Sequence, residues 1–190
     1  MIRIGILGDI GSGKSYVAKN FGYPVFDADK EVSNLYNKNK KIYKKLKKIL
    51  PKYFNKFPIQ KFEVSHAILD KKKNLKKIVQ VIHLEIRKKM NFFLKKNKST
   101  KIVILDIPLL LENKINQKKD ILIYVQSKKS DILSRLKKRK NFNKKLFIKF
   151  KSIQLPLDYK KKKSHFIIKN DFTKSRVLNH IKYILKEIKK

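Results

Sequence analysis

All five glycines of the chain lie within its first 22 residues, and three of them fall in one short segment. Residues 8–15 read Gly-Asp-Ile-Gly-Ser-Gly-Lys-Ser and match the pattern G-x-x-x-x-G-K-[ST], between an apolar run and a helix-compatible run. Glycine at these positions lets the backbone curl until successive N–H groups point inward, where they can bind phosphate oxygens. A glycine-rich turn that matches by chance is the alternative, which is hard to sustain in a chain so poor in glycine. The segment predicts a P-loop that binds a nucleoside triphosphate.

Different residues of this loop have different expected roles in binding the triphosphate. The helix that follows directs the positive end of its dipole at the phosphates. Lys14 can reach the outer phosphates, and the Ser15 hydroxyl can coordinate Mg²⁺. We therefore expect ATP and Mg²⁺ as ligands, with ATP held by nine consecutive residues: Gly8, Asp9, Ile10, Gly11, Ser12, Gly13, Lys14, Ser15 and Tyr16.

Length and composition exclude several classes of protein. The 190 residues fit a single domain that is large enough for a hydrophobic core. The absence of cysteine excludes a disulfide framework, a thiol nucleophile and a Cys-based zinc site. No run of about 18 apolar residues is present, and the first strand leaves no room for a signal peptide. We expect a cytoplasmic protein without a membrane partner, as a monomer or a small homo-oligomer.

The formal net charge of +37 is a possible sign of nucleic-acid binding. Only five of the 51 basic residues are arginine, and the lysines are scattered through every predicted element. Abundant lysine, asparagine, isoleucine and phenylalanine are also the products of codons rich in A and T. We therefore expect no specific nucleic-acid partner, although nonspecific adhesion at low salt is expected. Where arginine is retained, recognition of phosphate by its planar fork is a plausible reason.

Apolar runs alternate with amphipathic segments along the chain. Strands are expected at 2–7, 23–26, 101–106, 121–125 and 166–168, and helices at 13–21, 74–97, 130–138, 143–154 and over a last segment that ends near 188. Strands that alternate with helices after a P-loop predict an α/β fold, with a parallel five-stranded sheet flanked by helices. We expect a single P-loop kinase domain with a core at 1–29, 98–134 and 160–190, a helical acceptor-binding insertion at about 30–97 and a lid at about 135–159.

Four motifs in order resemble those of the dephospho-CoA kinases, along nearly the whole chain. They are the glycine-rich start, Val-Phe-Asp-Ala-Asp at 25–29, Ile-His-Leu-Glu-Ile-Arg at 82–87, and Asp-Ile-Pro-Leu-Leu-Leu-Glu-Asn at 106–113. The resemblance implies transfer of the γ-phosphoryl group of ATP to the ribose 3′-hydroxyl of dephospho-CoA, which gives CoA and ADP in the final step of coenzyme A biosynthesis. Another small-molecule kinase with the same fold and a nucleic-acid-associated P-loop protein are the alternatives. No Asn-Lys-x-Asp loop of a GTPase follows any strand.

Two acidic residues are candidates for the chemistry. Asp29 follows a strand on the ligand side of the sheet, where a carboxylate can take the proton of an attacking hydroxyl. The alternative is that Asp29 only caps the next helix. The family resemblance points to Asp29 as the catalytic residue, and Asp27 is expected to be structural. Asp106 ends the third strand, where it could hold Mg²⁺ through water, or it could be an ordinary loop aspartate.

Five residues are expected to bind the acceptor together with Asp29. His83 and Arg87 are four apart and share one helix face. We expect Arg87 to hold an anionic part of dephospho-CoA and His83 to orient the site, although a lone histidine on a helix can also be purely structural. Pro108, Leu109 and Glu112 belong to the fourth motif, and Glu112 is expected to secure the loop near the acceptor.

Arg135 and Arg139 repeat the spacing of four in a helix after the fourth strand, where small kinases carry a lid. Two arginines that close over the triphosphate would neutralise developing charge and exclude water, so we expect them to be catalytic. The alternative is a solvated basic helix. Asn170 follows the last strand and is expected to contact the adenine edge of ATP.

Three positions depart from the family pattern. Asp9 replaces the second glycine of the P-loop and places a carboxylate near a polyanion, which should cost little if the side chain points outward. Leu84 replaces the proline after the histidine and concerns only the start of a helix. Phe150 stands where the family often has arginine, which weakens the expected role of the second lid helix in phosphate binding.

Overall fold

The computed structural model describes residues 1–140 and 142–189, and these fall into two compact units. The first unit comprises Met1–Asp27, Leu94–Phe142 and Gln154–Lys190, and the second comprises Ala28–Phe93 and Asn143–Ile153. The chain therefore leaves the first unit twice, once after the second strand and once after residue 142. Over the described part of the chain, no helix is long and apolar enough to cross a membrane.

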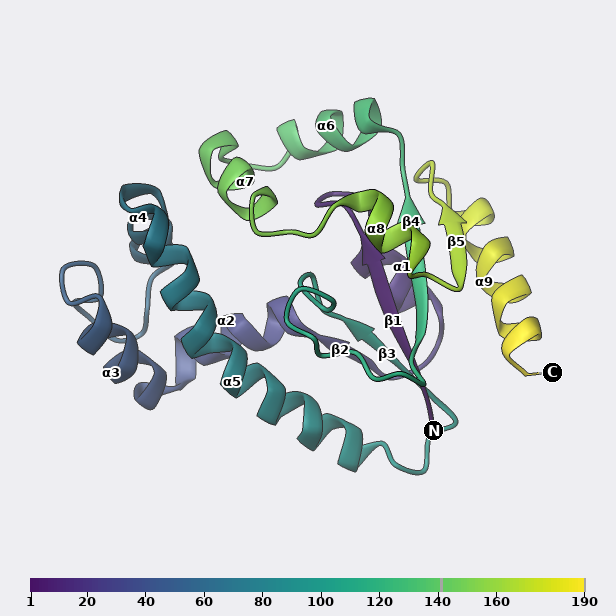
Figure 1. Cartoon of the computed structure of the whole chain (residues 1–190), viewed down its shortest axis with the longest axis horizontal. Coiled ribbons are helices and arrows are strands. Elements are labelled where there is room, and N and C mark those ends of the chain that lie inside the picture. The colour runs from purple at the N-terminus through teal and green to yellow at the C-terminus, as the bar shows by residue number, and fades with distance from the viewer. Residues whose placement is uncertain (141, 190) are drawn as a thin grey trace. The chain divides into compact units, whose positions relative to one another are not determined.

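The first unit is built on a parallel sheet of five strands, in the order β2-β3-β1-β4-β5 (Figure 1). The strands are β1 (Ile2–Gly8), β2 (Val25–Asp27), β3 (Ile102–Asp106), β4 (Ile121–Gln126) and β5 (Phe166–Lys169). Each neighbouring pair is parallel, which the alternation of strands and helices had predicted. Because parallel strands share their carboxyl edge, the P-loop after β1, Asp27 at the end of β2 and Asp106 at the end of β3 lie at the same edge of the sheet.

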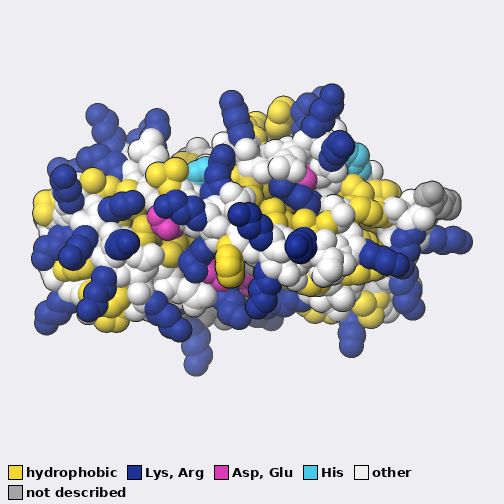
Figure 2. Space-filling view, turned by 90° about the horizontal axis from the view of Figure 1, so that it is seen from below, with side chains coloured by type: hydrophobic (Ala, Val, Ile, Leu, Met, Phe, Trp, Pro, Cys, Tyr) yellow, Lys and Arg dark blue, Asp and Glu magenta, His cyan; other side chains and the backbone are white. Residues whose placement is uncertain are grey.

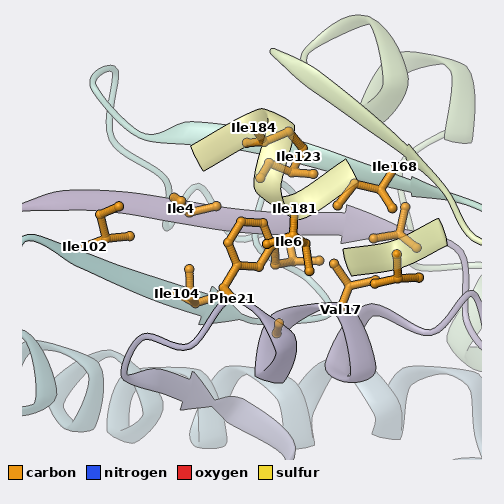
Figure 3. Packing of buried hydrophobic residues seen from close by; sticks show 13 residues of the cluster. Ile4, Ile6, Val17, Phe21, Ile102, Ile104, Ile123, Ile168, Ile181 and Ile184 are labelled. Carbon is orange, nitrogen blue, oxygen red and sulfur yellow. The ribbon is translucent and has the colours of Figure 1, made fainter. Parts of the chain in front are cut away.

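One face of the sheet is covered by α1 (Lys14–Asn20) and α9 (Lys174–Ile188). Figure 3 shows side chains from these helices meeting those of the strands in one buried cluster. Ile4 and Ile6 of β1 are fully buried at its centre, as is Val17 of α1. The remaining members of this core are Ala18, Phe21, Ile102, Ile104, Ile123, Val125, Ile168, Val177, Ile181 and Ile184. The last helix was expected to be amphipathic, and the apolar side that carries Val177, Ile181 and Ile184 faces the core.

Gly5 lets the loop after β3 approach the other face of the sheet. A Cβ atom at Gly5 would lie 2.5 Å from Leu110 Cδ2 and 3.0 Å from Leu122 Cδ2. Leu110 is completely buried, so it anchors residues 107–115 against β1. The same strand is contacted by α8 (Leu157–Lys162), and the sheet is covered on both faces as expected.

The second unit is helical. It contains α2 (Ala28–Lys38), α3 (Lys40–Ile49), α4 (Lys61–Asp70), most of α5 (Lys72–Lys96) and α7 (Lys144–Lys151). The amphipathic helix expected at 74–97 corresponds to α5, and the apolar side chains on its buried side include Leu75, Ile78, Ile82, Ile86 and Met90. Asn39 caps α3 and Asn143 caps α7, because each side chain accepts the N–H of the residue three positions later.

Two helices near the expected lid differ from the prediction. The helix expected at 143–154 ends at Lys151 and clusters with the second unit, and α8 in the first unit was not predicted. Pro156 starts α8 from its N-cap position, and the sequence Leu-Asp-Tyr-Lys-Lys-Lys carries no apolar periodicity that could reveal a helix.

Figure 2 shows Lys and Arg side chains over the whole visible face, with very few acidic ones among them. They are not gathered over one element, in keeping with the scatter of lysines along the sequence.

Candidate active site

The glycines give residues 8–15 the shape of a phosphate cradle. Gly11 and Gly13 have φ angles of 85° and 89°, in the left-handed region that residues with a Cβ rarely adopt. A Cβ atom at Gly13 would also lie 2.4 Å from Asn170 Nδ2. Gly13 directly precedes α1, so the free N–H groups at the start of that helix belong to the loop.

Lys14 lies folded along this loop. Its Nζ atom donates to the carbonyl oxygens of Asp9 and Gly8, at 2.7 and 3.3 Å. Both acceptors are neutral carbonyl oxygens, so a negatively charged phosphate oxygen can compete for the ammonium group. The Lys14 ammonium group thus holds the loop in shape through two carbonyl oxygens, at the position where the sequence predicts a contact with the outer phosphates.

The Asp9 side chain is buried against its own loop, so the condition under which it should cost little, an outward-pointing carboxylate, is not met. Asp9 is only 8% exposed, and its Oδ1 atom accepts a hydrogen bond from the N–H of Ile10 at 2.7 Å. The short carboxylate turns back on its own backbone, as aspartate commonly does in turns. One N–H of the loop is thus engaged by a side chain of the protein.

Ser15 and Asp106 are joined at the carboxyl edge of the sheet. The Ser15 hydroxyl forms a hydrogen bond with the Asp106 carboxylate, and Asp106 lies opposite Asp27 in the register of β2 and β3. Burial raises the pKa of the Asp106 carboxyl, while the hydrogen bond from Ser15 and the charge of Lys14 lower it. The nearby Asp27 raises it further, so a cation bound here would relieve repulsion between two carboxylates.

Asn170 stabilises the P-loop through a hydrogen bond to Ser12. It is only 2% exposed; its Nδ2 donates to the carbonyl of Ser12 at 2.8 Å, and its Oδ1 accepts the N–H of Phe172 at 2.9 Å. The Ser127 hydroxyl donates to the same Ser12 carbonyl at 3.0 Å. A contact of Asn170 with adenine would therefore depend on the second hydrogen of its amide.

A family model described as dephospho-CoA kinase matches residues 2–175. The chain belongs to the dephospho-CoA kinase family. It is therefore an ATP-dependent phosphotransferase, which phosphorylates the ribose 3′-hydroxyl of dephospho-CoA to give CoA and ADP, the final step of coenzyme A biosynthesis.

Relatives and solved structures agree with this membership. A dephospho-CoA kinase of Wolbachia sp. subsp. Brugia malayi (strain TRS) is 34% identical over 187 residues, which cover 96% of this chain and 95% of that protein. The crystal structure of TT1252 from Thermus thermophilus has a TM-score of 0.80 at 26% identity and covers 98% of this chain and 97% of that one. A dephospho-CoA kinase from Campylobacter jejuni shares the fold, with a TM-score of 0.63 at 21% identity, over 98% of this chain and 96% of that chain.

Asp29 of this kinase is the second residue of α2 and is exposed. Because the helix already begins at Ala28, Asp29 lies within the first turn and not at the capping position considered for it. A carboxylate there is favoured by the helix dipole and remains accessible to a ligand.

His83 and Arg87 lie one turn apart on α5 in the second unit, as predicted. Burial lowers the pKa of His83, and the charge of Arg87 lowers it further, so the imidazole is neutral near pH 7. Its Nε2 atom is buried and has no hydrogen-bond partner among the described residues. A neutral imidazole with one free nitrogen can orient a polar group of a ligand.

The lid arginines are placed differently from each other. Arg135 lies in α6 (Lys129–Lys137), and its guanidinium carbon stacks 4.2 Å from the centroid of the Phe172 ring. Arg139 was expected on the same helix, but α6 ends before it, where the Arg139 N–H bonds to the carbonyl of Leu136 three residues earlier. This tighter turn terminates the helix, so the two arginines do not share a helical face.

The fourth motif forms the loop after β3. Pro108 and Leu109 are half-buried, and the loop is held by bonds from the Ile115 N–H to the Leu110 carbonyl and from the Asn113 N–H to the Leu109 carbonyl. Glu112 has its carboxylate turned to residues 155 and 160 of the same unit.

Several residues of the site were not found from the sequence. Phe172 and Ser127 belong to no motif, and Lys160 is one lysine among many. Within the described residues there is no group of three or more histidine or acidic side chains that could hold a metal ion alone. A magnesium site here would thus have to combine few protein oxygens with phosphate oxygens, as is usual for this ion.

Proposed function

We propose that Lys14, Ser15, Asp29 and Asp106 carry the phosphoryl transfer of this kinase. The observation that best supports this assignment is the Ser15–Asp106 hydrogen bond beside Lys14, at the edge of the sheet where the P-loop ends. Lys14 exchanges its loop carbonyls for the outer phosphates of ATP and balances the charge that develops there. The bond from the γ-phosphorus to the bridging oxygen breaks, and ADP leaves with that electron pair.

The oxygen donors of Ser15 and Asp106 fit Mg²⁺, which prefers such ligands and keeps several waters. Bound there with ATP, the ion would neutralise charge on the β- and γ-phosphates. Ser15 would give its hydroxyl oxygen to the ion, and Asp106 would accept hydrogen bonds from water that the ion binds. The raised pKa of Asp106 supports this assignment, because a buried carboxylate beside Asp27 gains most from a nearby cation.

Ser15→Ala tests the magnesium assignment. The variant removes one oxygen ligand, so half-maximal turnover should require at least about tenfold more Mg²⁺ while the fold is kept. The measurement is turnover as a function of free Mg²⁺ at saturating ATP, with Ser130→Ala, in the exposed first turn of α6, as the control. An unchanged magnesium requirement would remove Ser15 from the metal site.

Asp29 takes the proton of the ribose 3′-hydroxyl as the new oxygen–phosphorus bond forms. Arg87 holds an anionic part of dephospho-CoA, and neutral His83 orients the acceptor with its free Nε2 atom. Pro108 and Leu109 line the acceptor site from the loop after β3. The exposure of Asp29 and the unpartnered nitrogen of His83 support these roles.

On the ATP side, Asn170 holds the Ser12 carbonyl and so fixes the shape of the P-loop, with its remaining amide hydrogen available to the adenine edge. Arg135 and Arg139 bind the triphosphate when the N-terminal part of the expected lid, which carries both arginines, closes over it. The stack of Arg135 on Phe172 supports this role, because it keeps the guanidinium extended in the unit that carries the P-loop.

Replacing either lid arginine with lysine should lower kcat more than it raises the KM for ATP. An ammonium keeps the charge but cannot form a forked pair of hydrogen bonds, and the contact is strongest in the transition state. We expect a loss of about 10- to 100-fold for each single variant, and a double variant that loses less than the product of the two. Steady-state kinetics of Arg135→Lys, Arg139→Lys and the double variant measure this, with Arg176→Lys, at an exposed position of α9, as control. If both single variants match the parent, the pair is only part of the basic surface.

We also propose a cytoplasmic enzyme, monomeric or a small homo-oligomer, with no specific nucleic-acid partner. Light scattering tests whether the enzyme is a monomer or a small homo-oligomer. A salt titration of DNA binding tests for a specific nucleic-acid partner, since nonspecific adhesion weakens steeply as the salt concentration rises.

A further inference from the structure

A buried ion pair in the first unit has no place in the chemistry above. Lys160 of α8 is 1% exposed, and its Nζ lies 2.6 Å from Glu112 Oε1; the Glu112 side chain is 9% exposed. The same Oε1 accepts the N–H of Leu155 at 3.0 Å. Lysine is among the residues least often buried, so a fully enclosed one requires a partner, and Glu112 is that partner.

Both residues of the pair belong to the first unit, and Lys160 lies a few residues after the point where the chain returns from the second unit. Residues 143–153 belong to the second unit, and the chain returns to the first at Gln154. Leu155 is the next residue, and Lys160 follows five residues later. Glu112 thus binds the returning segment twice, at the Leu155 N–H and at the Lys160 ammonium group. Within the returning segment, the Lys160 ammonium group also donates to the Gln154 side chain, with Nζ 3.5 Å from Oε1.

The returning segment is connected to both halves of the chemistry. Glu112 belongs to the loop after β3, which contains Pro108 and Leu109. On the other side, α8 contacts β1 and leads into β5, and the residue after β5 is Asn170, which bonds to the P-loop at Ser12. A shift of α8 would therefore reach the acceptor loop through Glu112 and the P-loop through Asn170.

Neither Glu112 nor Lys160 forms a second ion pair among the described residues. The second oxygen of Glu112 is buried and has no hydrogen-bond partner among the described residues. Removal of Lys160 would leave a buried carboxylate without a cation, and removal of the Glu112 charge would leave a buried ammonium. Breaking a buried pair is much more costly than replacing both partners together.

We propose that Glu112 and Lys160 are positioning residues: their ion pair fixes the segment 154–160 to the acceptor loop at the point where the chain returns from the second unit. Glu112 then acts through Leu155 and Lys160 and does not contact dephospho-CoA. The kinetic part of this proposal rests on the kinase function, whereas the ion pair itself can be tested without it.

The test is a double-variant cycle of Glu112→Gln and Lys160→Met, read by thermal melting and by steady-state kinetics. Each single variant should lower Tm by about 10 °C, and the double variant should lie within a few degrees of the parent, because both buried charges are gone. Each single variant should lower kcat by about 10- to 100-fold through misplacement and leave the KM for dephospho-CoA within about twofold. Lys162→Met, on an exposed position of α8, is the matched control and should change neither quantity.

Two results would overturn the proposal. A Glu112→Gln enzyme with unchanged Tm and kcat but a KM for dephospho-CoA raised tenfold would make Glu112 a direct ligand of the acceptor. Additive losses of Tm in the double variant would show that the two side chains act independently. If the parent enzyme failed to phosphorylate dephospho-CoA, the kinase function would fall, and the melting cycle would still decide whether the pair anchors the segment.

Discussion

Lys14→Ala should lower kcat by about 10²- to 10³-fold while the protein remains folded. In the proposed site this side chain binds the outer phosphates, and its loss leaves the charge that develops during transfer without its main partner. The fold should survive because α1 is anchored by Val17 and Ala18, which are fully buried, and not by Lys14. The measurement is turnover at saturating ATP, with melting temperature as the check on folding.

Lys19→Ala is the matched control for Lys14. It removes the same charge from the same helix at an exposed position, and we expect turnover within about twofold of the parent. Equal losses in the two variants would mean that the effect comes from net charge near the sheet edge. Full turnover of Lys14→Ala at saturating ATP would refute the role of the P-loop lysine.

Asp29→Asn should lower kcat by about 10²- to 10⁴-fold and leave ATP affinity nearly unchanged. Asparagine has the same shape but cannot accept the proton of the attacking hydroxyl at neutral pH. The loss of a first-turn carboxylate from α2 would by itself affect only stability, by about 0.3–1 kcal/mol. A fall in kcat without a matching fall in Tm therefore separates catalysis from a role in starting the helix.

Glu31→Gln provides the control for Asp29, since Glu31 lies in the same first turn and pairs with Lys89 at 2.9 Å within the second unit. We expect this variant to retain turnover within about twofold. If ATP affinity collapsed in Asp29→Asn, the residue would instead belong to the metal site.

The sheet and the P-loop could be predicted because their determinants are local. The apolar runs at 101–106 and 121–125 became β3 and β4 within one residue of the expected ends, since buried parallel strands need continuous apolar sequence. The P-loop was predicted from residue spacing alone, because its backbone shape depends on glycine at Gly11 and Gly13.

The parts that escaped prediction depend on contacts between distant segments or on local hydrogen bonds that residue spacing does not reveal. The helix was expected to end at 138 and α6 ends at Lys137, but residue spacing does not reveal the hydrogen bond from the Arg139 N–H to the Leu136 carbonyl that takes Arg139 off the helical face. The burial of Lys160 could not be predicted because 51 residues of the chain are lysine or arginine, and only the fold brings Glu112 to this one. Residue spacing left open where the Asp9 side chain points, and its hydrogen bond from the Ile10 N–H is a local contact that spacing does not reveal.

The most direct test of the account is ADP release from ATP and Mg²⁺ by the purified chain, measured with each of several acceptors. Dephospho-CoA should support release together with equal amounts of CoA. Three conditions should give only background: CoA itself, in which the 3′-oxygen already carries a phosphate, dephospho-CoA without Mg²⁺, and shikimate or a nucleoside as acceptor of another small kinase. ADP release that is independent of dephospho-CoA, or faster with another acceptor, would contradict the account.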